Sequence, residues 1–172
     1  MNDVQFEEQQ AFRWFVYAVV IVGLAGTVIG IEAALHLTGV GAEAGAIWWL
    51  HLWIVFPLAF GFNFLHMRTR VLGDELFVQF GYLFSIYRKR IPLKDIVEAR
   101  IVEYRPLRDA GGWGIRFGRF EGAPCRFLNC RGRRGVLVQT QERSYIIGSQ
   151  IPVQLHAALE EARRKQAGSS TG

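Results

Sequence analysis

Cysteine is scarce in this chain of 172 residues, which contains only Cys125 and Cys130. Four residues separate them, and neither a second cysteine pair nor a nearby histidine completes the ligand set of a zinc site. In a reducing compartment both side chains should remain thiols, with a disulfide as the alternative. The sequence therefore argues against a structural metal centre.

Signatures of catalysis are missing as well. Neither a P-loop nor a nucleophile elbow occurs in the sequence. The glycine-rich stretch at residues 111–114 precedes a predicted strand and not a helix, so it gives little support to a phosphate-binding loop. We expect a protein that is not an enzyme and that has no catalytic residues, no resident metal and no cofactor.

Charged residues are almost absent from positions 11–65, where only Arg13, Glu32 and Glu43 occur. The first apolar run extends from Trp14 to Ile31, and its 18 residues at about 1.5 Å each give a helix of roughly 27 Å. That length is close to the hydrocarbon thickness of a bilayer, where the backbone must satisfy its own hydrogen bonds. The run predicts a transmembrane helix, and a buried core helix of a soluble protein is the alternative.

A second apolar run, from Ala44 to Leu65, has 22 residues without Asp, Glu, Lys or Arg. Two such runs in succession are unusual for a soluble domain. We therefore expect residues 11–66 to form a transmembrane helical hairpin, with helices at about 12–36 and 46–66.

The residues that flank the hairpin predict its orientation. The connection at residues 37–45 has no Lys or Arg, whereas Arg13, Arg68 and Arg70 lie outside the two helices. The positive-inside rule then places both termini in the cytoplasm. Residues 1–10 form a polar, acidic segment without the basic region of a secretory signal, so we expect the first run to be retained in the mature protein.

Small residues recur on the first helix at Gly26, Gly30 and Ala34, a spacing of four. Such a stripe lets another helix approach closely, and the partner is either the second helix or a second copy. The alternative is that glycine is simply frequent in membrane helices.

Two histidines lie in or near the predicted spans. His51 is a remote candidate ligand for a haem iron or a pigment magnesium. His36 follows Glu32 by four residues, which suggests either an intramembrane acid–base pair or, as we favour, an interfacial pair near the lipid headgroups.

The sequence changes character after residue 68. Apolar and polar residues roughly alternate between turn signals such as Gly73-Asp74, Gly81 and Pro92. A period of two predicts half-buried antiparallel strands, and six or seven short ones suggest a small barrel or sandwich. The predicted strands cover residues 76–80, 83–87, 96–101, 113–117, 124–128, 135–140 and 144–147.

A single helix is expected to close the chain from Pro152, which suits a first helical turn. Leu155, Leu159 and Ala162 form one apolar stripe along it. Residues 166–172 are expected to be a flexible tail.

A family resemblance can be stated on four short strings. They are D-E-L-x-V-x-x-G at residues 74–81, I-P-L-x-x-I at 91–96, R-G-V-L-V at 134–138 and I-G-S-Q at 147–150. With the apolar hairpin before them, they resemble the bacterial pleckstrin-homology-like (PH-like) domains that are appended to transmembrane helices. The resemblance covers about residues 67–165 of the chain.

The resemblance implies seven strands in two bent sheets, a C-terminal helix that plugs one open end, and no catalytic set. It also implies a location in the bacterial inner membrane. The expected fold class is therefore α+β: a two-helix hairpin, then a PH-like antiparallel β barrel or sandwich capped by one helix. The family tends to have an acidic cap before the proline of that helix, where this chain has Gln150 and Ile151.

Positive charge is concentrated in residues 67–172, which carry 19 Lys and Arg against 10 Asp and Glu. One hypothesis is that these cations dock the domain on anionic phospholipid headgroups. The alternative is that they only set the orientation in the membrane. The candidate contacts for lipid or for a partner are Arg68, Arg70, Arg88, Lys89, Arg90, Arg131, Arg133 and Arg134.

We favour a membrane-anchored interaction module that acts as a scaffold, assembly factor or accessory subunit of a larger membrane complex. The basic residues already have a topological explanation, which weakens the case for lipid docking as the main role. The expected partners are the lipid bilayer and a protein, either another subunit or a second copy of the chain. Nucleic acid is not expected, because the domain is tethered to a membrane.

Overall fold

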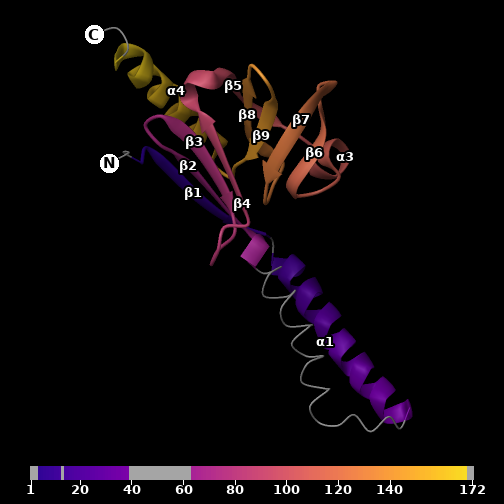
Figure 1. The fold of residues 1–172 in the computed structure, drawn as a ribbon. Coiled ribbons are helices and arrows are strands. Elements are labelled where there is room, and N and C mark those ends of the chain that lie inside the picture. Colours follow the sequence, from indigo (N-terminus) through magenta and orange to yellow (C-terminus); the bar gives the residue numbers. More distant parts are fainter. Residues whose placement is uncertain (1–3, 13, 39–62, 170–172) are drawn as a thin grey trace. The chain divides into compact units, whose positions relative to one another are not determined.

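A computed structural model of the chain describes residues 4–12, 14–38 and 63–169. The chain divides into two compact units, of which one comprises Met1–Ala11 and Leu65–Gly172 and the other Phe12–Phe64. We call the first the β unit and the second the apolar unit. The fold is α+β, with one N-terminal apolar helix, two β-sheets and a C-terminal helix (Figure 1).

The apolar unit contains helix α1, Trp14–Thr38. Its segment Val16–Leu37 has 22 residues and a mean hydropathy of 2.2, so it is long and apolar enough to cross a membrane. A signal sequence would meet the same criterion. The first predicted apolar helix is thus confirmed as a helix, and it is the one such span among the residues described.

The second predicted helix falls mainly on residues 39–62, which lie outside the described residues, as does His51. One boundary can still be corrected. The helix was expected to reach residue 66, but His66 is the first residue of a strand. His66 pairs there with Ala11. The residue that follows the apolar run is therefore already part of the sheet.

The first sheet has four antiparallel strands: β1 Phe6–Ala11, β2 His66–Val71, β3 Glu75–Phe80 and β4 Tyr87–Pro92. They lie in the order β1-β2-β3-β4. The register pairs Phe6 with Val71 and Ala11 with His66. One sheet therefore joins the segment before α1 to the segment that follows the second apolar run.

Strand β1 was not predicted. Its burial alternates along the strand, with Phe6, Glu8 and Gln10 facing inward. Two of these three inward residues are polar, so the period-two hydrophobic signal that identifies a half-buried strand is absent. The N-terminal segment was therefore read as merely polar and acidic.

The second sheet has five strands: β5 Ile96–Glu103, β6 Gly114–Phe120, β7 Ala123–Asn129, β8 Arg134–Thr140 and β9 Ser144–Gly148. Their order is β5-β8-β9-β7-β6. Strands β7 and β9 pair in parallel, and the other neighbours pair antiparallel. Each of the five overlaps a strand that was predicted from the sequence, and β6 starts one residue later than predicted.

One predicted strand is wrong in its position. Residues 83–87 were expected to form a strand, but residues 81–86 form a loop and β4 begins at Tyr87. In this stretch both alternating sets are apolar, so the sequence defines no inner and outer face. The backbone of Gly81, with a φ of 119°, starts the loop instead.

Alternate residues of the second sheet fill two layers. Val136, Val138 and Ile147 are fully buried on one face, together with Leu128. On the other face Phe127, Leu137 and Ile146 pack with Tyr104 and with Ala110. Ala110 belongs to the short helix α3, Pro106–Ala110, and a single 3-10 turn, η1 Leu93–Asp95, joins the two sheets.

Helix α4, Pro152–Ser169, contacts β1 and β2 of one sheet and β5 and β8 of the other (Figure 1). Its predicted stripe is confirmed, because Leu155, Leu159 and Ala162 are fully buried. The expectation of a flexible tail from residue 166 needs correction, since the helix continues to Ser169. Gln166 and Ala167 lie beside Leu93 in that last turn.

Candidate interaction surfaces at one end of the β unit

Several connections of the β unit meet at one end of its first sheet. Strand β1 ends there at Ala11 and β2 begins there at His66. The backbone N–H of Gly81 donates to the carbonyl oxygen of His66 at 2.9 Å, so the loop between β3 and β4 starts at the same level. This is the end at which the chain leaves the β unit for the apolar unit and returns from it.

The loop between β7 and β8 reaches the same end. The thiol of Cys130 lies 3.7 Å from the carbonyl oxygens of both Gln10 and Leu65, within reach of a weak hydrogen bond. The Gln10 side-chain amide donates to the carbonyl oxygen of Gly148 at 2.8 Å, which brings the end of β9 there too. We call this region the exit end, defined by Ala11, His66, loop 81–86 and loop 130–133.

Loop 81–86 is short, apolar and exposed. The exposed fractions of Tyr82, Leu83 and Phe84 are 69%, 80% and 51%. The Tyr82 ring lies against the His66 ring, with centroids 5.0 Å apart. A Cβ at Gly81 would lie 2.1 Å from the carbonyl oxygen of Phe84, so only glycine permits this tight path.

Loop 130–133 presents arginines from a fixed backbone. The carbonyl oxygen of Arg131 accepts from the Gln150 side chain at 3.1 Å, and that of Gly132 accepts from the Trp113 indole at 3.3 Å. The carbonyl oxygens of Arg133 and Arg134 accept from the backbone N–H groups of Tyr104 and Ser149. All three arginine side chains are exposed, and none forms an ion pair within the described part of the chain.

Arg68 and Arg70 are already paired. Both guanidinium groups contact the carboxylate of Glu7 on the neighbouring strand, with Arg70 Nε at 3.1 Å from Oε2. A hydrogen bond from Gln9 and these two cations lower the pKa of Glu7, against a smaller opposing effect of burial. These two candidate contacts therefore serve strand pairing before any external ligand.

The three candidates on β4 differ from one another. Arg88 is exposed, whereas Lys89 Nζ lies 5.3 Å from the centre of the Tyr145 ring. Arg90 is 3.5 Å from the carboxylate of Glu75 and lies over the ring of Phe77. Among the described residues, Arg88 is thus the one cation of the three without an ion pair or an aromatic contact.

Arg126 was passed over among the candidate contacts. Its guanidinium carbon lies 5.2 Å from the ring centre of Tyr87 and 4.6 Å from that of Phe117. A cation between two aromatic rings is held in place by their electron-rich faces. The register Phe117–Arg126 explains one of these contacts, and no local sequence pattern indicated the other.

A hollow of about 760 Å³ on the β unit is lined by further arginines. Arg105, Arg119 and Arg133 line it without forming an ion pair in the described residues, and Arg108 pairs with Asp109 at 3.2 Å. The full lining is Glu103, Tyr104, Arg105, Arg108, Asp109, Arg119, Phe120, Glu121, Gly122 and Arg133. Four arginines against three carboxylates give this surface a positive balance.

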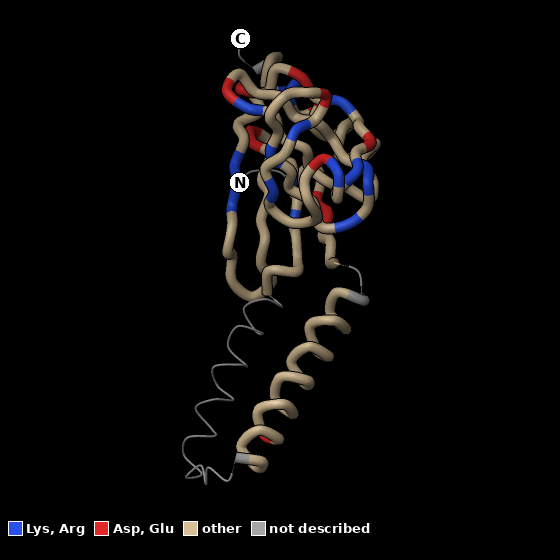
Figure 2. Tube along the Cα trace, turned by 90° about the vertical axis from the view of Figure 1, so that its right-hand side faces the viewer, with Lys and Arg blue, Asp and Glu red and all other residues tan. Residues whose placement is uncertain are grey.

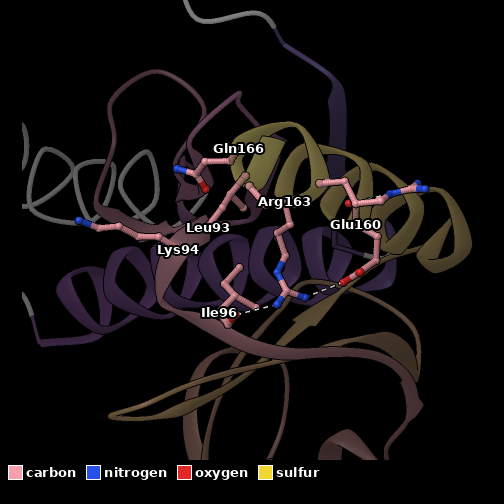
Figure 3. A pocket seen from close by; sticks show the side chains of 8 residues that line it. Leu93, Lys94, Ile96, Glu160, Arg163 and Gln166 are labelled. Atoms are coloured by element: carbon pink, nitrogen blue, oxygen red, sulfur yellow. Dashed lines mark hydrogen bonds and ion pairs between the residues drawn. The ribbon is translucent and has the colours of Figure 1, made fainter. Parts of the chain in front are cut away.

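A second hollow, of about 500 Å³, lies between α4 and the segment formed by η1 and the start of β5 (Figure 3). Arg163 crosses it, donating to the Glu160 carboxylate at 2.8 Å and to the carbonyl oxygen of Ile96 at 2.9 Å. These bonds use the guanidinium to fasten α4 to the edge of β5, where the register of the strand shifts. This hollow therefore has a structural explanation.

A buried carboxylate links β1 to the start of α4. The Glu8 side chain is 8% exposed and accepts from Ser149 Oγ at 2.6 Å and from the backbone N–H of Gln150 at 2.8 Å. Ser149 Oγ in turn accepts from the N–H of Ile151 at 3.1 Å. Glu8 on β1 thus accepts hydrogen bonds just before Pro152, where the sequence itself has Gln150 and Ile151 and no acidic residue.

The thiols are unsuited to nucleophilic chemistry. Burial raises the pKa of Cys125 to about 11 and raises that of Cys130 still further. Both are free and buried. Across the described ranges, no cluster of His, Cys, Asp and Glu has the composition of a metal site.

On α1 the stripe of Gly26, Gly30 and Ala34 is exposed, and a Cβ at either glycine would meet nothing within 4 Å. Lys and Arg (blue in Figure 2) are spread over the β unit and absent from α1. Packing of another helix against this stripe stays a prediction.

Searches against protein-family models, curated proteins and solved structures returned no match. The function of this chain must therefore be inferred from its own residues, and the exit end is the feature that carries most of that inference.

Proposed function

We propose that this chain is a membrane-anchored, PH-like interaction module that serves as a scaffold, assembly factor or accessory subunit of a larger membrane complex. The observation that carries the proposal is the pairing of Ala11 with His66. It ties the segment before the apolar unit and the segment after it into one sheet.

This pairing supports a retained anchor over a cleaved signal. Cleavage after α1 would remove β1, including the buried Phe6 and Gln10 and the Glu8 carboxylate that holds the start of α4. Buried polar groups that lose their partners are costly, so the β unit would be left with an exposed core edge and an uncapped helix.

The same pairing supports two crossings of the membrane. If α1 crosses a bilayer, the chain has to cross back before it can pair at His66. The apolar run of residues 44–65 is long enough for that return, although it falls largely outside the described residues. Both termini would then lie on one side, and the flanking arginines favour the cytoplasmic side of a bacterial inner membrane.

Support for a PH-like domain comes from two sheets closed by a C-terminal helix. Two sheets and a C-terminal helix that contacts both of them agree with what the resemblance implies. The described residues form four strands in one sheet and five in the other, which is more than the seven strands in total that the resemblance implies. A binding role fits better than catalysis, because the described residues gather arginines on surfaces and keep both thiols buried.

The hollow lined by Arg105, Arg119 and Arg133 is the surface that best fits a protein partner. These three arginines have no carboxylate partner in the described structure, so an acidic segment of another subunit would complement the hollow. The exposed stripe on α1 offers a second contact within the membrane.

Alkaline carbonate extraction and tag labelling test the anchoring. We expect the intact protein to stay in the membrane pellet, and tags at Met1 and Gly172 to be labelled only after the cells are opened. Release by carbonate, or labelling of either tag on sealed cells, contradicts the proposal.

Charge reversal tests the partner surface. Arg105→Glu with Arg119→Glu should abolish co-purification of a stoichiometric partner from native membranes. Arg143→Glu is the control, because Arg143 is exposed in the turn between β8 and β9. Equal loss in both variants, or unchanged co-purification, contradicts this part of the proposal.

Docking on anionic headgroups is the second candidate function. Arg131 and Arg133 favour it, because they extend from a fixed loop at the exit end, beside Leu65. Basic groups at such a position are attracted to an anionic leaflet.

A further inference from the structure

We propose that loop 81–86 is a membrane-inserting element, which places Tyr82, Leu83 and Phe84 in the boundary between lipid headgroups and acyl chains. This inference rests on the proposed membrane anchoring. It adds a contact between the β unit and the bilayer beyond the two chain segments that lead to the apolar unit. The occupant of this apolar surface is lipid.

The position of the loop is the first argument. Gly81 is hydrogen-bonded to His66, the residue at which the chain returns from the apolar unit. Leu83 lies two residues beyond Gly81, and at about 3.3 Å for each residue of a fully extended chain it can reach at most roughly 7 Å past that level. Interfacial elements sit about 5–10 Å deep in the same boundary.

The chemistry of the loop is the second argument. Residues 82–84 contain no charged side chain and are more than half exposed in the β unit. Tyrosine is favoured at the membrane–water interface, because its ring is apolar and its hydroxyl can be hydrated. The Tyr82 ring also contacts the His66 ring.

The shape of the loop is the third argument. The backbone N–H of Ile86 donates to the carbonyl oxygen of Phe80 at 3.0 Å, which closes the loop. Ser85 Oγ lies 3.4 Å from the carbonyl oxygen of Tyr87. With Gly81 fixing the other side, the loop is held with its apolar residues outward, so little ordering is needed on insertion.

Lipid is favoured over a protein partner by continuity with the anchor. The two chain segments that lead to the apolar unit leave from this same end, at Ala11 and Leu65. Loop 130–133, also at this end, adds Arg131 and Arg133, which suit headgroup phosphates. An apolar tip beside cations matches the layering of a bilayer surface better than it matches the mixed surface of a protein.

Depth-dependent quenching tests the inference on the full chain. Leu83→Cys, labelled with an environment-sensitive fluorophore, is reconstituted in vesicles of phosphatidylcholine and phosphatidylglycerol. Glu142→Cys is the matched control, in the turn at the opposite end of β8. The buried native thiols should label poorly, and the unlabelled parent chain measures any background.

We expect spin-labelled lipid to quench the Leu83→Cys label at least about twofold more strongly than the control label, and aqueous iodide to show the reverse order. Iodide quenching equal to that of the control overturns the inference. Protection from both quenchers, together with a dimer on gel filtration, also overturns it and indicates a second copy as the occupant.

Two controls separate this inference from the anchoring and from misfolding. Carbonate extraction of the same labelled protein reports on anchoring alone, so an iodide-quenched label on a retained protein rejects only the inserted loop. If Leu83→Cys elutes differently from the parent chain, Phe84→Cys replaces it, because Phe84 is on the same loop and is also exposed. The same two quencher results then decide the outcome.

Discussion

At the scale of the residue, polar side chains decide how the β unit is assembled. Glu7 and Glu8 are neighbours on β1 with opposite roles. Glu7 faces outward and pairs with Arg68 and Arg70, whereas Glu8 faces inward and holds the backbone at Gln150. Because a buried group leaves its partners unsatisfied when it is removed, Glu8 should matter far more for stability than Glu7.

Glu8→Ala should lower the free energy of unfolding by about 1.5–3 kcal/mol, since it leaves a buried N–H and a hydroxyl without their acceptor. Glu7→Ala, the control, should cost about 0–1 kcal/mol, because its ion pairs are partly exposed. Denaturant unfolding of the purified full chain in detergent measures both. Equal costs would show that the Glu8 contacts do not hold α4.

The buried thiols predict a loss of stability at high pH. The pKa of Cys125 is raised to about 11, so the folded protein keeps a proton that the unfolded chain releases at its ordinary, lower pKa. The stability from the neutral thiol is complete below the unfolded pKa and is lost as the pH rises toward 11. The free energy of unfolding should therefore fall between about pH 9 and 11, and less so for Cys125→Ala than for the parent chain.

At the scale of the element, strand β1 and loop 81–86 matter most. Strand β1 comes before the apolar unit in sequence and yet forms the edge of a sheet made after it. Loop 81–86 replaces a predicted strand and starts beside the same exit end. Both elements are hydrogen-bonded to β2. Strand β2 is also the first strand after the apolar unit.

Gly81→Ala should distort loop 81–86, because a Cβ would collide with the carbonyl oxygen of Phe84 at a φ of 119°. We expect a loss of more than about 1 kcal/mol in the free energy of unfolding. Gly73→Ala is the matched control, since a Cβ there meets nothing within 4 Å and should change stability little. A similar melting temperature for both variants contradicts the tight geometry of the loop.

At the scale of the whole molecule, charge and apolar surface are divided between the two units. Helix α1 carries Glu32 as its sole Asp, Glu, Lys or Arg, whereas the arginines line loops and hollows of the β unit (Figure 2). Under the proposed function, this division would hold a charged module at a membrane surface, where its loops would meet either lipid or a neighbouring subunit.

The lipid contribution of loop 130–133 is testable on the reconstituted chain. Phosphatidylglycerol should raise the melting temperature of the parent chain. Each arginine near the surface should add about 1 kcal/mol to the free energy of binding to the anionic leaflet. Arg131→Glu with Arg133→Glu should abolish that rise, and added salt should weaken it in the parent. The Arg143→Glu control should behave as the parent does; the opposite result assigns the effect to net charge alone.

Helix α1, strand β3 of the first sheet, the strands of the second sheet and helix α4 could be predicted from the sequence alone. Each of these has a local hydrophobic period, and burying one face of an element requires that period wherever the element lies in the fold. The sequence also identified Arg131 and Arg133 as cations, because charge is a property of the side chain alone.

Which of these residues meet depends on the tertiary fold. Strand β1 forms because residues 6–11 pair with residues 66–71, which follow the apolar unit in the sequence. Its inward residues Glu8 and Gln10 are polar, so they give no hydrophobic signal. The gathering of loops 81–86 and 130–133 at the exit end rests on hydrogen bonds such as that from Gly81 to His66. Contacts between residues so distant in the chain leave no periodic trace in the sequence, so their geometry had to come from the fold.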